Sequence, residues 1–203
     1  MTRPRQQGFT LIEAIIALTI AATLLVVMFA GLRVGLAAWQ RGDERAEALQ
    51  RERSITEILT SALAATHPYQ VAAKGREPAH LLFEGEPARV AFVTAAAPFA
   101  AAQPIAYTAV TLSQDAGSGL AIRQKALPND QPFDRLAPTV VDATVTTVAF
   151  RYLRESDRAW TDRWDVAAEK ALPVAIEVTL TIARGARAVE RPPLLVSLPV
   201  SAP

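Results

Sequence analysis

The feature that most constrains this chain is a stretch of 19 residues without a charge, from Ala14 to Leu32. A helix rises about 1.5 Å per residue, so the stretch covers most of the ~30 Å hydrocarbon core of a bilayer. Arg3 and Arg5 precede it. Because basic flanking residues stay on the cytoplasmic side, we expect the N-terminus to lie inside and the rest of the chain to be exported.

Two simple interpretations of this N-terminus are a cleaved secretory signal peptide and an uncleaved signal anchor. A secretory signal has an apolar core of roughly 7–15 residues followed by a small-residue cleavage site. The stretch here is longer and continues into a helix-forming segment. A secretory signal therefore fits the sequence poorly.

One carboxylate, that of Glu13, lies at the start of the apolar stretch. A carboxylate deep in a bilayer costs on the order of 2.5–3.5 kcal/mol, even on permissive insertion scales. Two hypotheses follow. Glu13 lies near the cytoplasmic interface and reaches the headgroups, or it awaits a positively charged partner in an assembly.

The residues from Gly8 to Glu13 read Gly-Phe-Thr-Leu-Ile-Glu, after a short basic leader and before the apolar helix. This string resembles the class III signal of type IV prepilins and type II secretion pseudopilins. The resemblance implies a leader at residues 1–8, cut between Gly8 and Phe9 by a prepilin peptidase, and N-methylation of Phe9. It also implies that Glu13 pairs with the N-terminal amine of a neighbouring subunit, which removes two buried charges at once.

The predicted helix extends well beyond the membrane. No proline occurs between Pro4 and Pro68, and because proline is the strongest helix breaker, one helix can run from about Phe9 to about Thr66. We expect residues 9–32 to span the membrane and residues 33–66 to form a periplasmic helix. Its apolar face, suited to packing on a sheet, comprises Ile55, Ile58, Leu59, Ala62 and Leu63.

Residues 67–203 differ in composition from the helical part, because 13 of the 14 prolines lie after Thr66. Alternating apolar and polar residues at 174–182 predict an antiparallel strand with one solvated face. The fold class is therefore α+β: a long N-terminal helix whose second half packs on antiparallel β-sheet, which is the pseudopilin plan. The expected strands are 81–83 and 89–94 around a hairpin turn at 84–88, then 105–112, 120–124, 145–153, 174–182 and 194–200, with irregular loops at 98–104 and 128–138.

The C-terminal half also resembles one pseudopilin more than the others. The segments Phe150–Leu153 and Leu172–Val178, with Trp160 and Trp164 between them, resemble the J-type minor pseudopilin of type II secretion systems. The resemblance implies a place in the pseudopilus tip complex that primes assembly and supports export of folded proteins. The implied partners are I- and K-type minor pseudopilins, the major pseudopilin, prepilin peptidase and the inner-membrane secretion platform.

Two interpretations of the paired tryptophans remain open. Trp160 and Trp164 pack in the core at the base of the sheet, or they form an aromatic patch that faces a partner, since tryptophan is enriched at binding hot spots.

The composition argues against several other functions. The absence of cysteine excludes a disulfide scaffold, a zinc-thiolate site and a thiol nucleophile. A net charge of +1 and an aromatic content of 6% argue against a nucleic-acid binder. His67 and His80 are isolated from other metal-ligand residue types. We expect neither an enzyme nor a cofactor.

One loop carries three carboxylates that could hold a calcium ion, Asp157, Asp162 and Asp165. Arg158 and Arg163 are interleaved with them, and the loop lacks an EF-hand pattern. We therefore expect a solvated charged loop and no metal.

Two alternative functions stay open. The first is a minor type IV pilin involved in pilus priming, adhesion or DNA uptake. The second is a signal-anchored periplasmic binding or sensor module, which would keep its N-terminus unprocessed. The leading hypothesis is a single-pass inner-membrane pseudopilin with a cytoplasmic N-terminus and a periplasmic C-terminal domain.

Overall fold

The structure of the chain is a computed structural model that describes residues 10–72, 79–99, 106–115, 119–129, 131–134, 138, 140–185 and 187–199. The chain divides into two units, Met1–Arg53 and Ser54–Pro203. Gly8 and Phe9, which carry the predicted cleavage site, lie outside the described residues.

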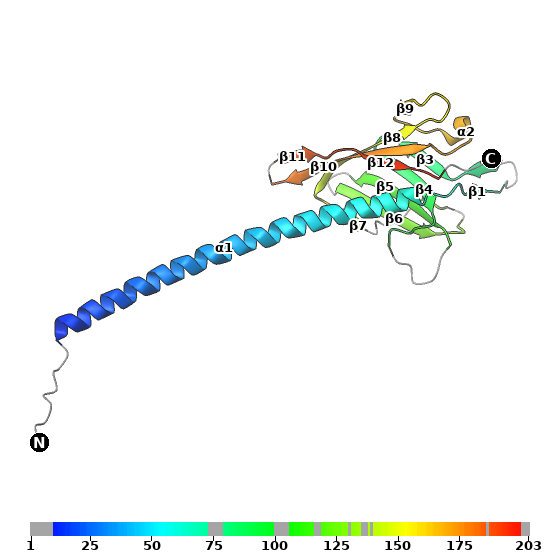
Figure 1. The fold of residues 1–203 in the computed structure, drawn as a ribbon. Coiled ribbons are helices and arrows are strands. Elements are labelled where there is room, and N and C mark those ends of the chain that lie inside the picture. The colour runs from blue at the N-terminus through cyan, green and yellow to red at the C-terminus, as the bar shows by residue number, and fades with distance from the viewer. Residues whose placement is uncertain are drawn as a thin grey trace, which may run out of the picture. The chain divides into compact units, whose positions relative to one another are not determined.

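One helix, α1 (Leu11–Ala64), begins in the first unit and ends in the second (Figure 1). Its 54 residues span about 80 Å at ~1.5 Å per residue. The predicted single long helix is thus confirmed. In the part of α1 that belongs to the first unit, the large apolar side chains from Leu11 to Leu49 are at least half exposed.

The end of α1 is tied to a strand of the second unit. Thr66 pairs with Thr94, and the N–H of His67 donates to the carbonyl of Val93 at 2.8 Å. The ring of His67 stacks on Tyr107, with 4.4 Å between the ring centroids. These contacts hold the chain directly after α1, where Pro68 cannot continue the helix.

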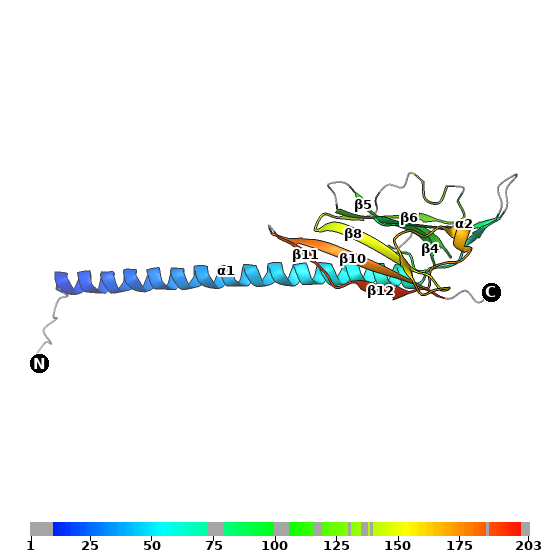
Figure 2. The same ribbon diagram turned by 90° about the horizontal axis from the view of Figure 1, so that it is seen from above.

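Within its described residues, the second unit contains two antiparallel sheets of five strands and one two-stranded ribbon. In the first sheet the strands lie in chain order, β3-β4-β5-β6-β7. In the second the order is β11-β10-β8-β9, with β12 beside β11 on the same edge of β10. Figure 2 shows β4, β5 and β6 in a layer apart from β8, β10 and β12.

The strand bounds are β1 (Gln70–Val71), β2 (His80–Leu81), β3 (Phe83–Glu86), β4 (Arg89–Thr94), β5 (Thr108–Asp115), β6 (Gly119–Ala126), β7 (Val140–Asp142), β8 (Val145–Leu153), β9 (Trp160–Thr161), β10 (Ala175–Arg184), β11 (Arg187–Glu190) and β12 (Leu194–Ser197). One short helix, α2 (Val166–Glu169), follows β9.

Among the described residues, a hydrophobic core joins the last turns of α1 to both sheets. Leu59 and Leu63 of the helix are fully buried, as the predicted apolar face requires. In β8 and β10 of the second sheet, buried residues alternate with less buried ones, which is the period-2 pattern of a strand with one buried face. In the first sheet, β4 and most of β5 are buried on both faces. The core residues of the two sheets include Val90, Phe92, Val110, Leu112, Phe150, Tyr152, Ile176 and Val178.

The strand predictions hold best where alternation is long. The strand predicted at 145–153 is confirmed with both ends as β8, and 174–182 corresponds to β10. The turn expected at 84–88 is tighter, because Pro87 and Ala88 alone connect β3 to β4. The prediction lacked β1, β7, β9, β11 and α2. The strands β1, β7 and β9 have two or three residues, too few for a period, and β11 is exposed along its whole length.

Candidate functional site

The predicted assembly residue Glu13 lies in the first turn of α1 and is exposed. Its N–H donates to the hydroxyl oxygen of Thr10 at 3.4 Å, and the N–H of Ala14 donates to the Thr10 carbonyl at 3.2 Å. Thr10 and Glu13 thus have the spacing of a capping box, Thr-x-x-Glu, which was not among the predictions from sequence. The carboxylate of Glu13 lies at the positive end of the helix dipole.

Among the described residues, α1 is the helix that is long and apolar enough to cross a membrane, judged by length and composition. None of its most apolar 18-residue window is buried within the chain. Removing such side chains from water releases roughly 25 cal/mol per Å². These exposed apolar side chains are therefore more stable in contact with lipid or protein than in water.

Trp164 lies in the core, 5% exposed, as the packing interpretation predicted. Its backbone N–H donates to the carbonyl of Gly85, and its indole N–H donates to the carbonyl of Ala171, both at 2.9 Å. Both N–H donors of the residue are thus satisfied inside the chain. Its role in the fold is to close the first sheet against the loop that follows β9.

Gly85 lets β3 approach this tryptophan closely. A Cβ at position 85 would lie 2.7 Å from the Trp164 Cβ and 2.8 Å from the Tyr152 ring carbon Cζ. The Tyr152 hydroxyl donates to the Glu86 carbonyl at 2.9 Å, and burial raises the pKa of that hydroxyl above its ordinary value. The ring of Tyr152 thus fixes the β3–β4 hairpin to β8.

Trp160 has a different environment from Trp164. It is half-buried in β9, where the guanidinium of Arg151 lies 5.8 Å from the centre of its ring. Arg151 also forms ion pairs with Asp162 and Glu177, each at 3.4 Å. Trp160 therefore lies on the polar outer face of the second sheet, and for this residue the interpretation as a partner-facing aromatic stays a prediction.

The three aspartates of the predicted charged loop serve separate purposes. Asp157 pairs with Arg154 at 3.0 Å, and its pKa is lowered by the N–H of Ala159 and by Arg154. Asp162 pairs with Arg151, and Asp165 caps α2 by accepting from the Ala167 N–H at 2.9 Å. Within the described residues, no group of three His, Cys, Asp or Glu side chains is placed to hold a metal ion.

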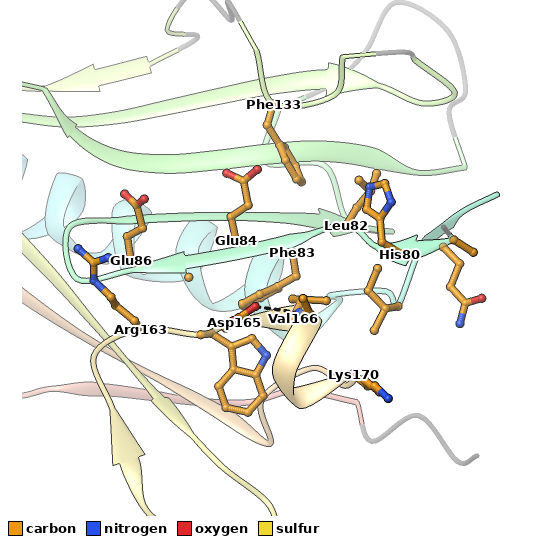
Figure 3. Close-up of a pocket in the computed structure, with 16 residues that line it drawn as sticks. His80, Leu82, Phe83, Glu84, Glu86, Phe133, Arg163, Asp165, Val166 and Lys170 are labelled. Carbon is orange, nitrogen blue, oxygen red and sulfur yellow. Dashed lines mark hydrogen bonds between the residues drawn. The ribbon is translucent and has the colours of Figure 1, made fainter. Parts of the chain in front are cut away.

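A groove of about 1110 Å³ runs along β2 and β3 on the side of α2 (Figure 3). The groove was not predicted from the sequence, although the sequence carries a signal for the helix α2 that forms one of its walls. Asp165 is a good N-cap residue, and the good helix formers Ala167, Ala168 and Glu169 follow it after Val166, which predicts the short helix α2. The residues that define the groove are Leu81, Leu82, Phe83, Phe133, Trp164, Val166 and Ala167, with Glu84, Glu86 and Lys170 at its rim.

Known proteins match both parts of the chain. Residues 30–191 match the family of type II secretion system protein J, and residues 3–29 match the prokaryotic N-terminal methylation motif. Over 90 residues the chain is 38% identical to type II secretion system protein J of Xanthomonas campestris pv. campestris. That alignment covers 44% of this chain and 43% of the relative, so it spans less than half of either protein.

Proposed function

The chain belongs to the family of type II secretion system protein J, and we propose that it works as a minor pseudopilin. In this role it is a membrane-anchored subunit of the pseudopilus tip complex, which primes assembly and supports export of folded proteins. The observation that carries the proposal is the family match from residue 30 to residue 191, which takes in most of the second unit.

The proposed mechanism is assembly in three steps and involves no catalysis by this chain. Prepilin peptidase first removes residues 1–8 and methylates Phe9. Glu13 then pairs with the N-terminal amine of a neighbouring subunit. Finally, the apolar helices bundle as the subunit leaves the bilayer. The methylation-motif match over residues 3–29 and the exposed apolar side chains of α1 support this sequence of events.

The proposal includes a location and a set of partners. Residues 9–32 cross the inner membrane once, with the N-terminus in the cytoplasm, while the helix 33–66 and the β-rich part 67–203 lie in the periplasm. Arg3 and Arg5 support this orientation, since basic residues are retained on the cytoplasmic side. The partners are the I- and K-type minor pseudopilins, the major pseudopilin, the peptidase and the inner-membrane platform.

The two alternative functions have less support. A minor type IV pilin would share the N-terminal motif, but the match over residues 30–191 is to a secretion family. A signal-anchored binding module would have no need of a methylation motif, which residues 3–29 match.

The experiment that tests the proposal compares Glu13→Ala with Glu44→Ala in a secreting strain. Glu44 is an exposed carboxylate on the same helix, beyond the apolar stretch. We expect Glu13→Ala to impair incorporation and secretion while the second unit still folds, and Glu44→Ala to behave as wild type. Normal assembly and secretion by Glu13→Ala would contradict the proposed mechanism.

A further inference from the structure

The strands β2 and β3 together form one extended segment from His80 to Glu86, interrupted only at Leu82. One edge of this segment is paired, first with β1 and then with β4. At the junction, the N–H of Leu82 donates to the Tyr69 carbonyl at 2.9 Å. Because backbone groups alternate between the two edges of a strand, those of Leu81 and Phe83 face the opposite edge.

That opposite edge is occupied at a single position among the described residues, where Gly85 accepts from the Trp164 N–H. Beyond Trp164 the chain turns away into α2, with Asp165 as its N-cap and Lys170 in a left-handed conformation at its end. A helix turn thus replaces the strand that would have continued past Phe83. An open strand edge is a template for pairing with another extended chain.

The groove lies along this open edge. Figure 3 shows Phe83 beside Val166 at the inner wall, with Phe133 on the other side of the strand. The opening of about 1110 Å³ has room for several side chains of an added segment. In strand addition the backbone supplies the hydrogen bonds, and alternate side chains enter pockets.

The strand side of the rim carries two glutamates, while Arg163 and Lys170 line the groove on the side of the loop and α2. Glu84 and Glu86 lie two residues apart, so their carboxylates point to the same side, as Figure 3 shows. Glu84 forms an ion pair with Arg89. Glu86 is exposed and has no ion pair among the described residues. A basic side chain on the incoming segment would complement this charge.

We propose that the groove binds an extended segment of a neighbouring pseudopilus subunit. The segment adds as a strand beside Leu81 and Phe83 and places a lysine or arginine against Glu84 and Glu86. An extended chain fits better than a helix because the open groups belong to a strand edge. The inference rests on the proposed function, since the neighbour is a subunit of the same assembly.

The test uses the full-length protein in detergent micelles with the purified I- and K-type subunits of its own secretion system. Hydrogen exchange at the amides of Leu81 and Phe83 is measured with and without these subunits. Ala167→Trp fills the groove from α2, and Glu86→Lys reverses the rim charge. Glu190→Lys makes the same charge change on the exposed strand β11 and serves as the matched control.

We expect the two amides to exchange at least tenfold more slowly in the complex. Ala167→Trp and Glu86→Lys should each weaken binding by about tenfold, and Glu190→Lys should leave it unchanged. A complex that forms without protecting these amides, or that both groove variants join as well as wild type, overturns the groove inference and leaves the tip-complex role intact. Absence of any complex contradicts that role and this inference together.

Discussion

The backbone N–H of Trp164 donates to the carbonyl of Gly85 at 2.9 Å, which joins the loop after β9 to the edge of the other sheet. The Tyr152 hydroxyl bonds to the next carbonyl along, that of Glu86. Two residues from the second sheet and its loop thus hold consecutive positions of β3. The groove beside β3 depends on this junction for its shape.

The close approach of Gly85 to Trp164 and Tyr152 predicts that Gly85→Ala is destabilising. Its added Cβ would meet Trp164 and Tyr152 at 2.7 and 2.8 Å, and overpacking of this kind costs typically about 1–3 kcal/mol. Thermal unfolding of the full-length protein in detergent measures the effect. Gly42→Ala is the control, because a Cβ there meets nothing within 4 Å. Equal melting temperatures for Gly85→Ala and wild type would show that the junction is looser than described.

The buried hydroxyl of Tyr152 predicts a pH-dependent stability. Burial raises its pKa in the folded chain, so the folded state retains the proton that the unfolded chain loses near pH 10. The free energy of unfolding should therefore be unaffected by this group below pH 10 and should fall as the pH rises above it. Tyr152→Phe should lose about 1 kcal/mol at neutral pH and show a shallower alkaline fall. Denaturant titrations at pH 8 and pH 11 measure both, and an unchanged alkaline slope in the variant would refute the assignment.

The two tryptophans should behave differently when truncated. Trp164→Ala removes a buried side chain and should cost about 3–5 kcal/mol in the free energy of unfolding. Trp160→Ala should cost much less, because that ring is half-buried on the outer face beside Arg151. Denaturation of each variant checks the order. A Trp160→Ala variant as unstable as Trp164→Ala would place Trp160 in the core.

The loop aspartates should give no calcium response. Asp157 and Asp162 are held by arginines, and Asp165 is held by the N-terminus of α2. Because a ligand stabilises the folded state only when it binds there, adding millimolar calcium or a chelator should leave the melting temperature unchanged. A rise with calcium that disappears in Asp157→Asn would show that these carboxylates rearrange around the ion.

Long periodic segments were predictable from sequence. The helix α1 follows from 63 consecutive residues without proline, and the alternating strand β8 follows from its buried Val148, Phe150 and Tyr152. Local patterns of this kind state which face is buried without reference to the rest of the chain. The same logic predicted the buried residues Leu59 and Leu63.

The groove could not be predicted in the same way. It depends on how the two sheets are separated, on the bridge from Trp164 to Gly85 and on the turn into α2. The bridge joins residues about 80 positions apart, so no local pattern predicts it. The sequence pattern also could not separate Trp160 from Trp164, because an aromatic residue carries the same local signal in a core and on a surface. Strand pairing gives the two tryptophans their different environments, because Trp160 pairs with Leu153 of β8 and Trp164 pairs with Gly85 of β3.

The processed N-terminus tests the central claim most directly. Mass spectrometry of the protein purified from cells with active prepilin peptidase gives its first residue and any modification. The account predicts a chain that begins at an N-methylated Phe9 and lacks residues 1–8. An intact Met1 from the same cells would contradict it.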